Sequence, residues 1–345
     1  MGVGRVDDCC HFPRIPHSAF RIPHSAFAMP LSRREMVLGV VAVLAGLGLL
    51  ALVLPPAGPP QTGRGPVAPP TPTASRATVP LPAGYGVVAR SGVQAADLDL
   101  LGPVWYSDGG AEGPDLPGHP RIRVLSPDDG RSDADVRVLV RAHPHRWWIL
   151  GAAANRPGAA GQTPVAYARY YARIAAQIHG VDPSASVLPA GLAAADTAWA
   201  TAFRTAYATQ TGAPLEPNGW NIHDVLADEA DPYDFPTWRQ RIETFHAWMA
   251  ANGDGARPLL LGEFGALAGA GCCHQSVDNH NQAQLFMQRA LDWLDGSGVV
   301  SAWAWTPFNA QGTDWNGGLL RPAVAGTLSP FGGLYRDHAA AFMRR

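Results

Sequence analysis

The sequence predicts a (β/α)8 TIM barrel preceded by a transmembrane helix and a proline-rich linker. Eight short apolar runs of strand length begin at Tyr85, and helical patterns lie between most of them, as in a parallel sheet covered by helices. The unit spans about 260 residues, which is a typical size for one such barrel. With 345 residues, 47% of them hydrophobic, and a net charge of −2, the chain can bury a core of this size and shows no sign of a nucleic-acid partner.

Residues 1–28 precede the predicted anchor and contain the heptapeptide RIPHSAF twice, at 14–20 and 21–27. Two such short units cannot stack into a repeat domain. We interpret this segment as the product of a start codon assigned too early, with Met29 as the true start.

A membrane anchor is predicted over residues 29–54, because the 19 residues from 36 to 54 carry no charge and such a run is just long enough to span a bilayer. Arg33 and Arg34 precede the run and predict a cytoplasmic N-terminus, which places the following domain outside the cytoplasm as a single-pass cell-membrane protein. The alternative is a secreted protein with a cleaved signal peptide, but Pro55 and Pro56 stand where a cleavage site would be expected.

Residues 55–84 are a predicted disordered linker. Ten prolines lie between 55 and 82 among Gly, Thr, Ala and Ser. This composition favours an extended, semi-rigid spacer. It would hold the domain of residues 85–345 away from the membrane.

The predicted strands are residues 85–89, 104–106, 121–125, 147–150, 186–189, 219–223, 258–261 and 299–305. Helices are predicted at 164–179, where Thr163 is the N-cap and Pro164 the first helical residue, and at 197–210, 236–251 and 279–294. Residues 107–120 are rich in Gly and Pro and are too short for a normal crossover helix. The connection between the second and third strands is therefore the weakest match to the fold.

Glu263 is the first candidate for a catalytic residue. It directly follows the apolar strand of residues 258–261, within the sequence Gly-Glu-Phe-Gly. Active sites of such barrels are built at the carboxyl ends of the strands. A helix-capping or loop carboxylate is the alternative for an isolated glutamate.

The fourth predicted strand carries a second signal. Residues 146–158 read RWWILGAAANRPG, and together with the seventh strand they resemble the large clan of retaining (β/α)8 glycoside hydrolases. In that clan the fourth strand ends in a Gly-Asn-Glu-Pro type motif and the seventh in a glutamate. The present chain departs from the motif at Ala152, Ala153 and Ala154, so Ala153 occupies the position of the missing acid/base glutamate.

The resemblance implies that Glu263 is the nucleophile and that a sugar lies across neighbouring strands. His223 and Asn221 end the sixth strand, where the clan often has a histidine before an aromatic residue; here Asp224 follows instead. Further substrate-binding candidates are the aromatic residues Trp105, Tyr106, Trp303 and Trp305. Trp303 and Trp305 share one face of their strand, and each has core packing as the alternative to a sugar platform.

Two functions remain open: a membrane-anchored glycoside hydrolase impaired by Ala153, and an inactive glycan-binding pseudo-glycosidase. Asp224 or Asp196 would have to replace the missing acid for full activity. A serine hydrolase is not expected, because no G-x-S-x-G motif is present. The expected partners are a carbohydrate and, through the N-terminal helix, a membrane.

No cofactor or metal is expected. The cysteines occur as two adjacent pairs, Cys9-Cys10 and Cys272-Cys273, predicted on opposite sides of the membrane, so a disulfide framework is not expected. The alternative is a metal site formed by Cys272 and Cys273 with His274 and His280, but these residues lack the usual spacing of metal ligands.

Overall fold

The computed structural model describes residues 78–89, 93–156, 161–226, 233–266, 277–306, 308, 318–321 and 326–345. The repeat, the predicted anchor, most of the linker and all four cysteines lie outside these residues. Within them, no helix is both long enough and apolar enough to cross a membrane.

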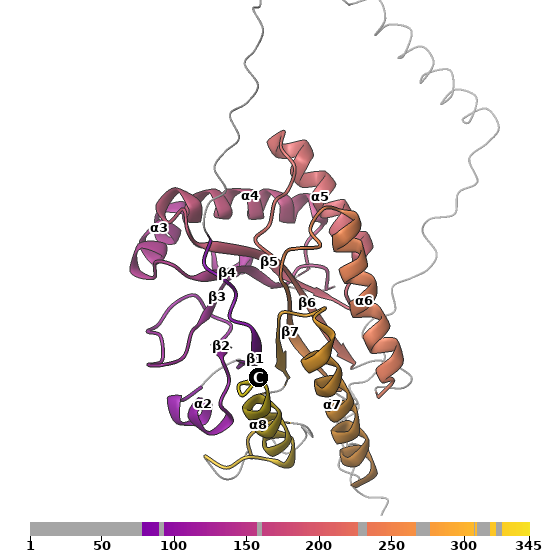
Figure 1. The fold of residues 1–345 in the computed structure, drawn as a ribbon. Helices are drawn as coiled ribbons and strands as arrows, with labels where there is room; N and C mark the ends of the chain where they lie inside the picture. Colours follow the sequence, from indigo (N-terminus) through magenta and orange to yellow (C-terminus); the bar gives the residue numbers. More distant parts are fainter. Residues whose placement is uncertain are drawn as a thin grey trace, which may run out of the picture. The chain divides into compact units, whose positions relative to one another are not determined.

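Eight parallel strands form a barrel, as predicted (Figure 1). They are β1 (Gly84–Val88), β2 (Trp105–Ser107), β3 (Ile122–Leu125), β4 (Trp147–Ala153), β5 (Ser186–Ala193), β6 (Trp220–Leu226), β7 (Leu259–Ala266) and β8 (Ala302–Trp305). The strand order is β2-β1-β8-β7-β6-β5-β4-β3. A parallel bridge between Tyr106 and Arg121 joins the two edge strands and closes the sheet.

Helices alternate with the strands and lie outside them (Figure 1). The four predicted helices are present as α4 (Pro164–Val181), α5 (Thr197–Thr211), α6 (Phe235–Ala251) and α7 (Val277–Ser297). The Thr163 side chain caps α4 by accepting a hydrogen bond from the backbone N–H of Ala166, and Pro164 begins the helix.

Three further helices were not predicted: α2 (Ala95–Leu101), α3 (Asp133–Ala142) and α8 (Pro330–Phe342). A signal for α3 was present in the sequence, because Ser132 and Asp135 form a capping box at its start.

The connection between β2 and β3 contains no helix, in agreement with its short, glycine-rich sequence. Arg121 and Arg123 instead face outward from β3 and hold this loop. Arg121 donates to Asp108 at 2.6 Å, and Arg123 donates to Asp115 at 2.6 Å. Both guanidinium groups also donate to loop carbonyls, those of Gly110, Ala111, Glu112, Gly113 and Pro114.

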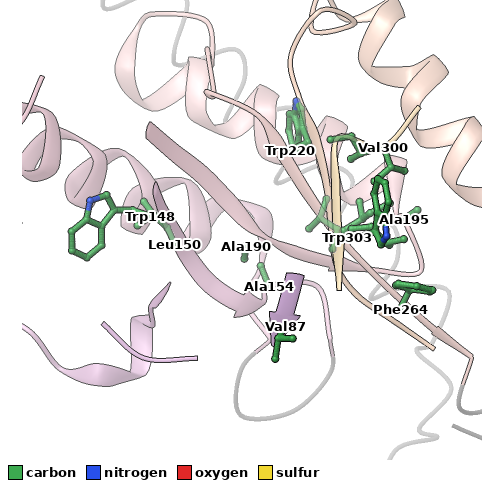
Figure 2. Close-up of a cluster of buried hydrophobic side chains, with 14 of the residues drawn as sticks. Val87, Trp148, Leu150, Ala154, Ala190, Ala195, Trp220, Phe264, Val300 and Trp303 are labelled. Atoms are coloured by element: carbon green, nitrogen blue, oxygen red, sulfur yellow. The ribbon is translucent and has the colours of Figure 1, made fainter. Parts of the chain in front are cut away.

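Side chains alternate between two apolar cores, because successive residues of a strand face opposite sides. The inner core fills the barrel with Trp105, Ile122, Val124, Trp147, Ile149, Leu188, Leu260, Ala302 and Ala304. The outer core lies between strands and helices and includes Trp148, Leu150, Trp220 and Phe264 (Figure 2). A cavity lined in part by inner-core residues opens at the carboxyl end of the barrel, where the candidate site lies.

The opposite end of the barrel is closed by the first described residues. Val79 and Leu81 pack against the inner core. The indole of Trp147, at the start of β4, donates to the Pro80 carbonyl at 2.9 Å. The chain therefore reaches the barrel at the face opposite to the carboxyl ends of the strands.

Candidate active site

A cavity of about 60 Å³ opens among the carboxyl ends of the strands. Its polar lining side chains are Ser107, Asn221, His223 and Glu263, and its apolar walls come mainly from the inner core. The full lining is Val88, Trp105, Ser107, Gly109, Val124, Ile149, Gly151, Ala152, Asn221, His223, Leu260, Gly262 and Glu263. This is the end of a (β/α)8 barrel at which catalytic residues are found.

Glu263 lies on β7 and is half-buried in the cavity wall. The register of β7 shifts against both neighbouring strands around Gly262. A Cβ atom at Gly262 would lie 2.6 Å from Oδ1 of Asn221 and 3.0 Å from Nε2 of His223. Glycine is therefore needed here for β7 to pass close to the two polar side chains of β6.

His223 is paired in register with Glu263, so the two residues lie side by side on β6 and β7. Its imidazole also reaches across to β5, because a Cβ atom at Gly191 would lie 2.2 Å from Nε2. The imidazole ring therefore fits between β5 and β7 because Gly191 and Gly262 have no side chains.

Asn221 points into the cavity from a deeper position on β6. Only 1% of its surface is exposed. Neither Nδ2 nor Oδ1 has a hydrogen-bond partner among the described residues. A buried amide without partners is destabilising, and this feature separates Asn221 from ordinary core residues.

β4 contributes no functional group to the cavity. Its register against β5 shifts between Leu150 and Ala153, and Gly151 has φ 104°. Ala152 lines the cavity and is exposed, whereas Ala153 is half-buried and does not belong to the lining. Among the described lining residues Glu263 is thus the only carboxylate.

Asp224 and Asp196, the two candidate replacements for the missing acid, make contacts elsewhere. Asp224 faces outward from β6 and forms a two-point ion pair with Arg241, at 3.1 and 2.9 Å. Asp196 caps α5 by accepting from the backbone N–H of Trp199 at 2.9 Å. Neither carboxylate lines the cavity.

The predicted aromatic residues divide between two environments. Trp105 lines the cavity, and its indole donates to the Gly84 carbonyl at 3.1 Å. Tyr106 faces away from it and accepts a hydrogen bond from the backbone N–H of Leu116. Trp303 and Trp305 are also placed elsewhere than expected: both are buried in the outer core (Figure 2 shows Trp303).

The register of β8 explains why Trp303 and Trp305 lie in the outer core. Trp303 makes edge contacts with Tyr85 and Phe342, and Trp305 with Phe264. Ala302 and Ala304 face the barrel interior instead. Strand periodicity showed that the two tryptophans share a face but did not show which face was inside.

Sequence reasoning missed Ser107, Gly191 and Gly262 as determinants of the cavity. The glycines next to Glu263 and on β5 were visible in the sequence, but their role depends on contacts between strands. Among the described residues, no group of three or more His, Cys, Asp or Glu side chains could hold a metal ion.

Among known proteins, the chain resembles solved structures in its fold. No protein-family model and no curated protein matches the chain. Solved structures do match. A GH128 (subgroup II) endo-β-1,3-glucanase from Pseudomonas viridiflava is 18% identical with a TM-score of 0.56, over 74% of this chain and 97% of that chain.

Two further glucanases are similar to the same extent. A GH128 (subgroup III) curdlan-specific exo-β-1,3-glucanase from Blastomyces gilchristii, in complex with glucose, is 15% identical with a TM-score of 0.55, over 73% of this chain and 97% of that chain. A GH128 (subgroup I) endo-β-1,3-glucanase from Amycolatopsis mediterranei is 16% identical with a TM-score of 0.56, over 74% and 99%. At these identities the likeness shows a shared (β/α)8 fold.

Proposed function

We propose that this protein binds a β-linked glucan in the cavity around Glu263 and hydrolyses it only weakly. The observation that carries the proposal is the composition of the cavity wall: β6 and β7 contribute Asn221, His223 and Glu263, whereas β4 contributes Ile149, Gly151 and Ala152, none of which has a polar side chain. The solved neighbours are β-1,3-glucanases, and one, as a glutamate-to-alanine variant, was crystallised with laminaritriose and laminaribiose. This supports a β-1,3-linked glucan as the ligand class.

Weak hydrolysis follows from the missing second carboxyl group. A retaining glycosidase uses two carboxyl groups about 5 to 5.5 Å apart, one as nucleophile and one as acid and then base. In the proposed reaction Glu263 attacks the anomeric carbon and the glycosidic oxygen departs. At Ala153 no group can protonate that oxygen, and none can later take a proton from the attacking water.

The second candidate function is glycan binding without cleavage. It is favoured by the contacts of Asp224 and Asp196, which are used in an ion pair and a helix cap rather than in the cavity. The two functions share the binding site and differ only in turnover.

We also propose that residues 29–54 anchor the protein in the cell membrane with the barrel outside the cytoplasm, and secretion is the alternative. The uncharged run of residues 36–54 and the two arginines before it support this placement.

Calorimetric titration of the full-length protein with laminari-, cello- and xylo-oligosaccharides tests the binding proposal. We expect laminari-oligosaccharides to bind, and His223→Ala to weaken that binding. Arg131→Ala removes a partly exposed ion pair with Glu112; because neither residue lines the cavity, this variant serves as the control with unchanged affinity. If no β-linked glycan binds the wild-type protein, both candidate functions are excluded.

A further inference from the structure

The side-chain amide of Asn221 is a polar group that the proposed hydrolysis does not explain. It is buried in the cavity wall, and neither of its polar atoms has a partner among the described residues. A carboxamide carries both a donor and an acceptor. A matching ligand group must therefore accept one hydrogen bond and donate another, as a hydroxyl group does.

The surroundings of Asn221 favour a group with a short apolar stem. Val124, Ile149 and Leu260, members of the inner core, line the cavity together with this amide. Gly262 also lines the cavity and brings the β7 backbone close to the buried amide, because a Cβ atom there would lie only 2.6 Å from Oδ1. The site thus combines one amide with walls that suit a methylene group.

The cavity is large enough for a small substituent of a sugar but not for a whole sugar ring. One water needs roughly 10 to 15 Å³ on this measure, so the cavity of about 60 Å³ holds only a few atoms of that size. A secondary hydroxyl is attached directly to the ring and cannot enter such a space without the ring. A hydroxymethyl group projects one carbon beyond the ring and can enter it.

We infer that Asn221 binds the hydroxymethyl group of a hexose unit and so makes the site select hexose over pentose glycans. This inference rests on the proposed glycan-binding function. The sugar ring then lies toward the exposed Ala152 side of the cavity, near Glu263. A pentose unit lacks the hydroxymethyl group and leaves the amide without its partner, which penalises its binding.

The decisive comparison uses two trisaccharides with the same linkage, laminaritriose and β-1,3-linked xylotriose, titrated against the full-length protein. We expect the wild-type protein to prefer laminaritriose by at least about 10-fold, since sites built to bind a hydroxyl reject analogues that lack it. Asn221→Leu should reduce this preference to about 2-fold or less. It should also raise the melting temperature, because it replaces an unpaired buried amide by an apolar group of similar size.

Asn155→Leu is the matched control. The Asn155 side chain donates to the Ala193 carbonyl at 3.0 Å and accepts from the Ala193 N–H at 2.7 Å, outside the cavity. Its loss should lower the melting temperature and leave the trisaccharide preference unchanged. Asn221→Ala is a second test of the amide if the leucine variant does not fold.

The outcomes distinguish the inference from the function on which it rests. If Asn221→Leu or Asn221→Ala keeps the full laminaritriose preference, or if the wild-type protein binds both trisaccharides equally, the amide does not read the hydroxymethyl group and the inference is wrong. If neither trisaccharide nor any other β-glucan binds, the proposed function itself has failed.

Discussion

Three consecutive alanines stand where the resembling hydrolases carry Asn-Glu-Pro: Ala152 and Ala153 end β4, and Ala154 directly follows it. Ala152 lines the cavity, Ala153 lies beside Gly191 of β5, and Ala154 packs in the outer core. In those hydrolases the asparagine binds the sugar 2-hydroxyl, the glutamate transfers the proton and the proline fixes the loop. Of the three positions in this chain, only Ala152 lines the cavity.

Activity should be restored by the triple change Ala152→Asn, Ala153→Glu, Ala154→Pro. The new glutamate would have a raised pKa in a partly desolvated site near the Glu263 charge, as a general acid requires. We expect kcat/KM on laminarin to rise by at least about 10², the lower end for general acid catalysis. Ala153→Glu alone should gain less, and Glu263→Ala in the triple background should abolish the gain. A folded, glycan-binding triple variant without activity would favour the pure binding function.

The wild-type protein should turn over only substrates with good leaving groups. An aryl leaving group departs without protonation, so an aryl β-glucoside can still glycosylate Glu263. The glycosyl-enzyme should then accumulate, and azide should accelerate its breakdown because azide attacks without base assistance. Steady-state and burst kinetics measure both effects. Equal rates on laminarin and the aryl glycoside would show that another residue supplies the proton.

At the scale of elements, the loop between β2 and β3 replaces a helix and is held by buried guanidinium groups. Arg123 is fully buried and donates to Asp115 and to two loop carbonyls. Burial raises the pKa of Asp115, but hydrogen bonds and charge from Arg146 and Arg123 outweigh it and hold that pKa below its usual value. These ion pairs perform the covering role that helices have elsewhere around the barrel.

Arg123→Leu should destabilise the protein by about 1 to 3 kcal/mol, as expected when buried polar groups lose their hydrogen-bond donor. The change also leaves the Ala111 carbonyl without its guanidinium donor. Arg131→Ala, which removes a partly exposed ion pair with Glu112, should cost less than about 1 kcal/mol. Urea denaturation measures both values. Similar losses for the two variants would contradict the structural role of Arg123.

The contact between Arg123 and His143 leads us to expect that stability depends on pH. Burial, followed by the charge of Arg123, lowers the pKa of His143, whose Nδ1 lies 2.9 Å from that guanidinium group. A lowered pKa in the folded state means that the unfolded chain binds the proton more tightly. The contribution of His143 to the free energy of unfolding is therefore complete above the pKa of histidine in the unfolded chain, about 6.5. It is lost as the pH falls through the lower pKa of the folded state.

His143→Gln tests this dependence, because glutamine keeps an acceptor for Arg123 but does not titrate. The free energy of unfolding should fall less between pH 7.5 and pH 5 in the variant than in the wild-type protein. An unchanged slope would assign the pH dependence to other groups.

At the scale of the molecule, residues 78–83 belong to the barrel rather than to the linker. The compact unit begins at Arg76, and Val79 and Leu81 pack against the inner core at the end of the barrel opposite to the cavity. The last residues of the predicted linker, 55–84, thus include side chains and a carbonyl that contact the barrel.

Deleting residues 1–77 should leave the midpoint of urea denaturation unchanged within error. Deleting residues 1–83 should lower it clearly, because the inner core loses two apolar side chains and Trp147 loses the Pro80 carbonyl that accepts its indole hydrogen bond. Equal midpoints for the two truncations would show that residues 78–83 contribute nothing to the fold.

The sequence alone determined the barrel, because strand-length apolar runs and helix caps are local signals that can be counted along the chain. It placed Glu263 at the carboxyl end of β7 and Ala152 and Ala153 at the end of β4, since both positions follow from where a strand stops. It also indicated, from the glycine-rich residues 107–120, that no helix joins β2 to β3. Helix α2 was missed because it has only 7 residues.

Only the tertiary structure decided which face of each strand lines the cavity. Trp303 and Trp305 could be assigned to one face by periodicity, but a shift of a single residue in register exchanges inside and outside. The unpaired amide of Asn221 and the space provided by Gly191 and Gly262 likewise exist only because β5, β6 and β7 are brought together. Contacts between strands depend on register and bulges, which residues distant in the sequence set jointly, so no local pattern encodes them.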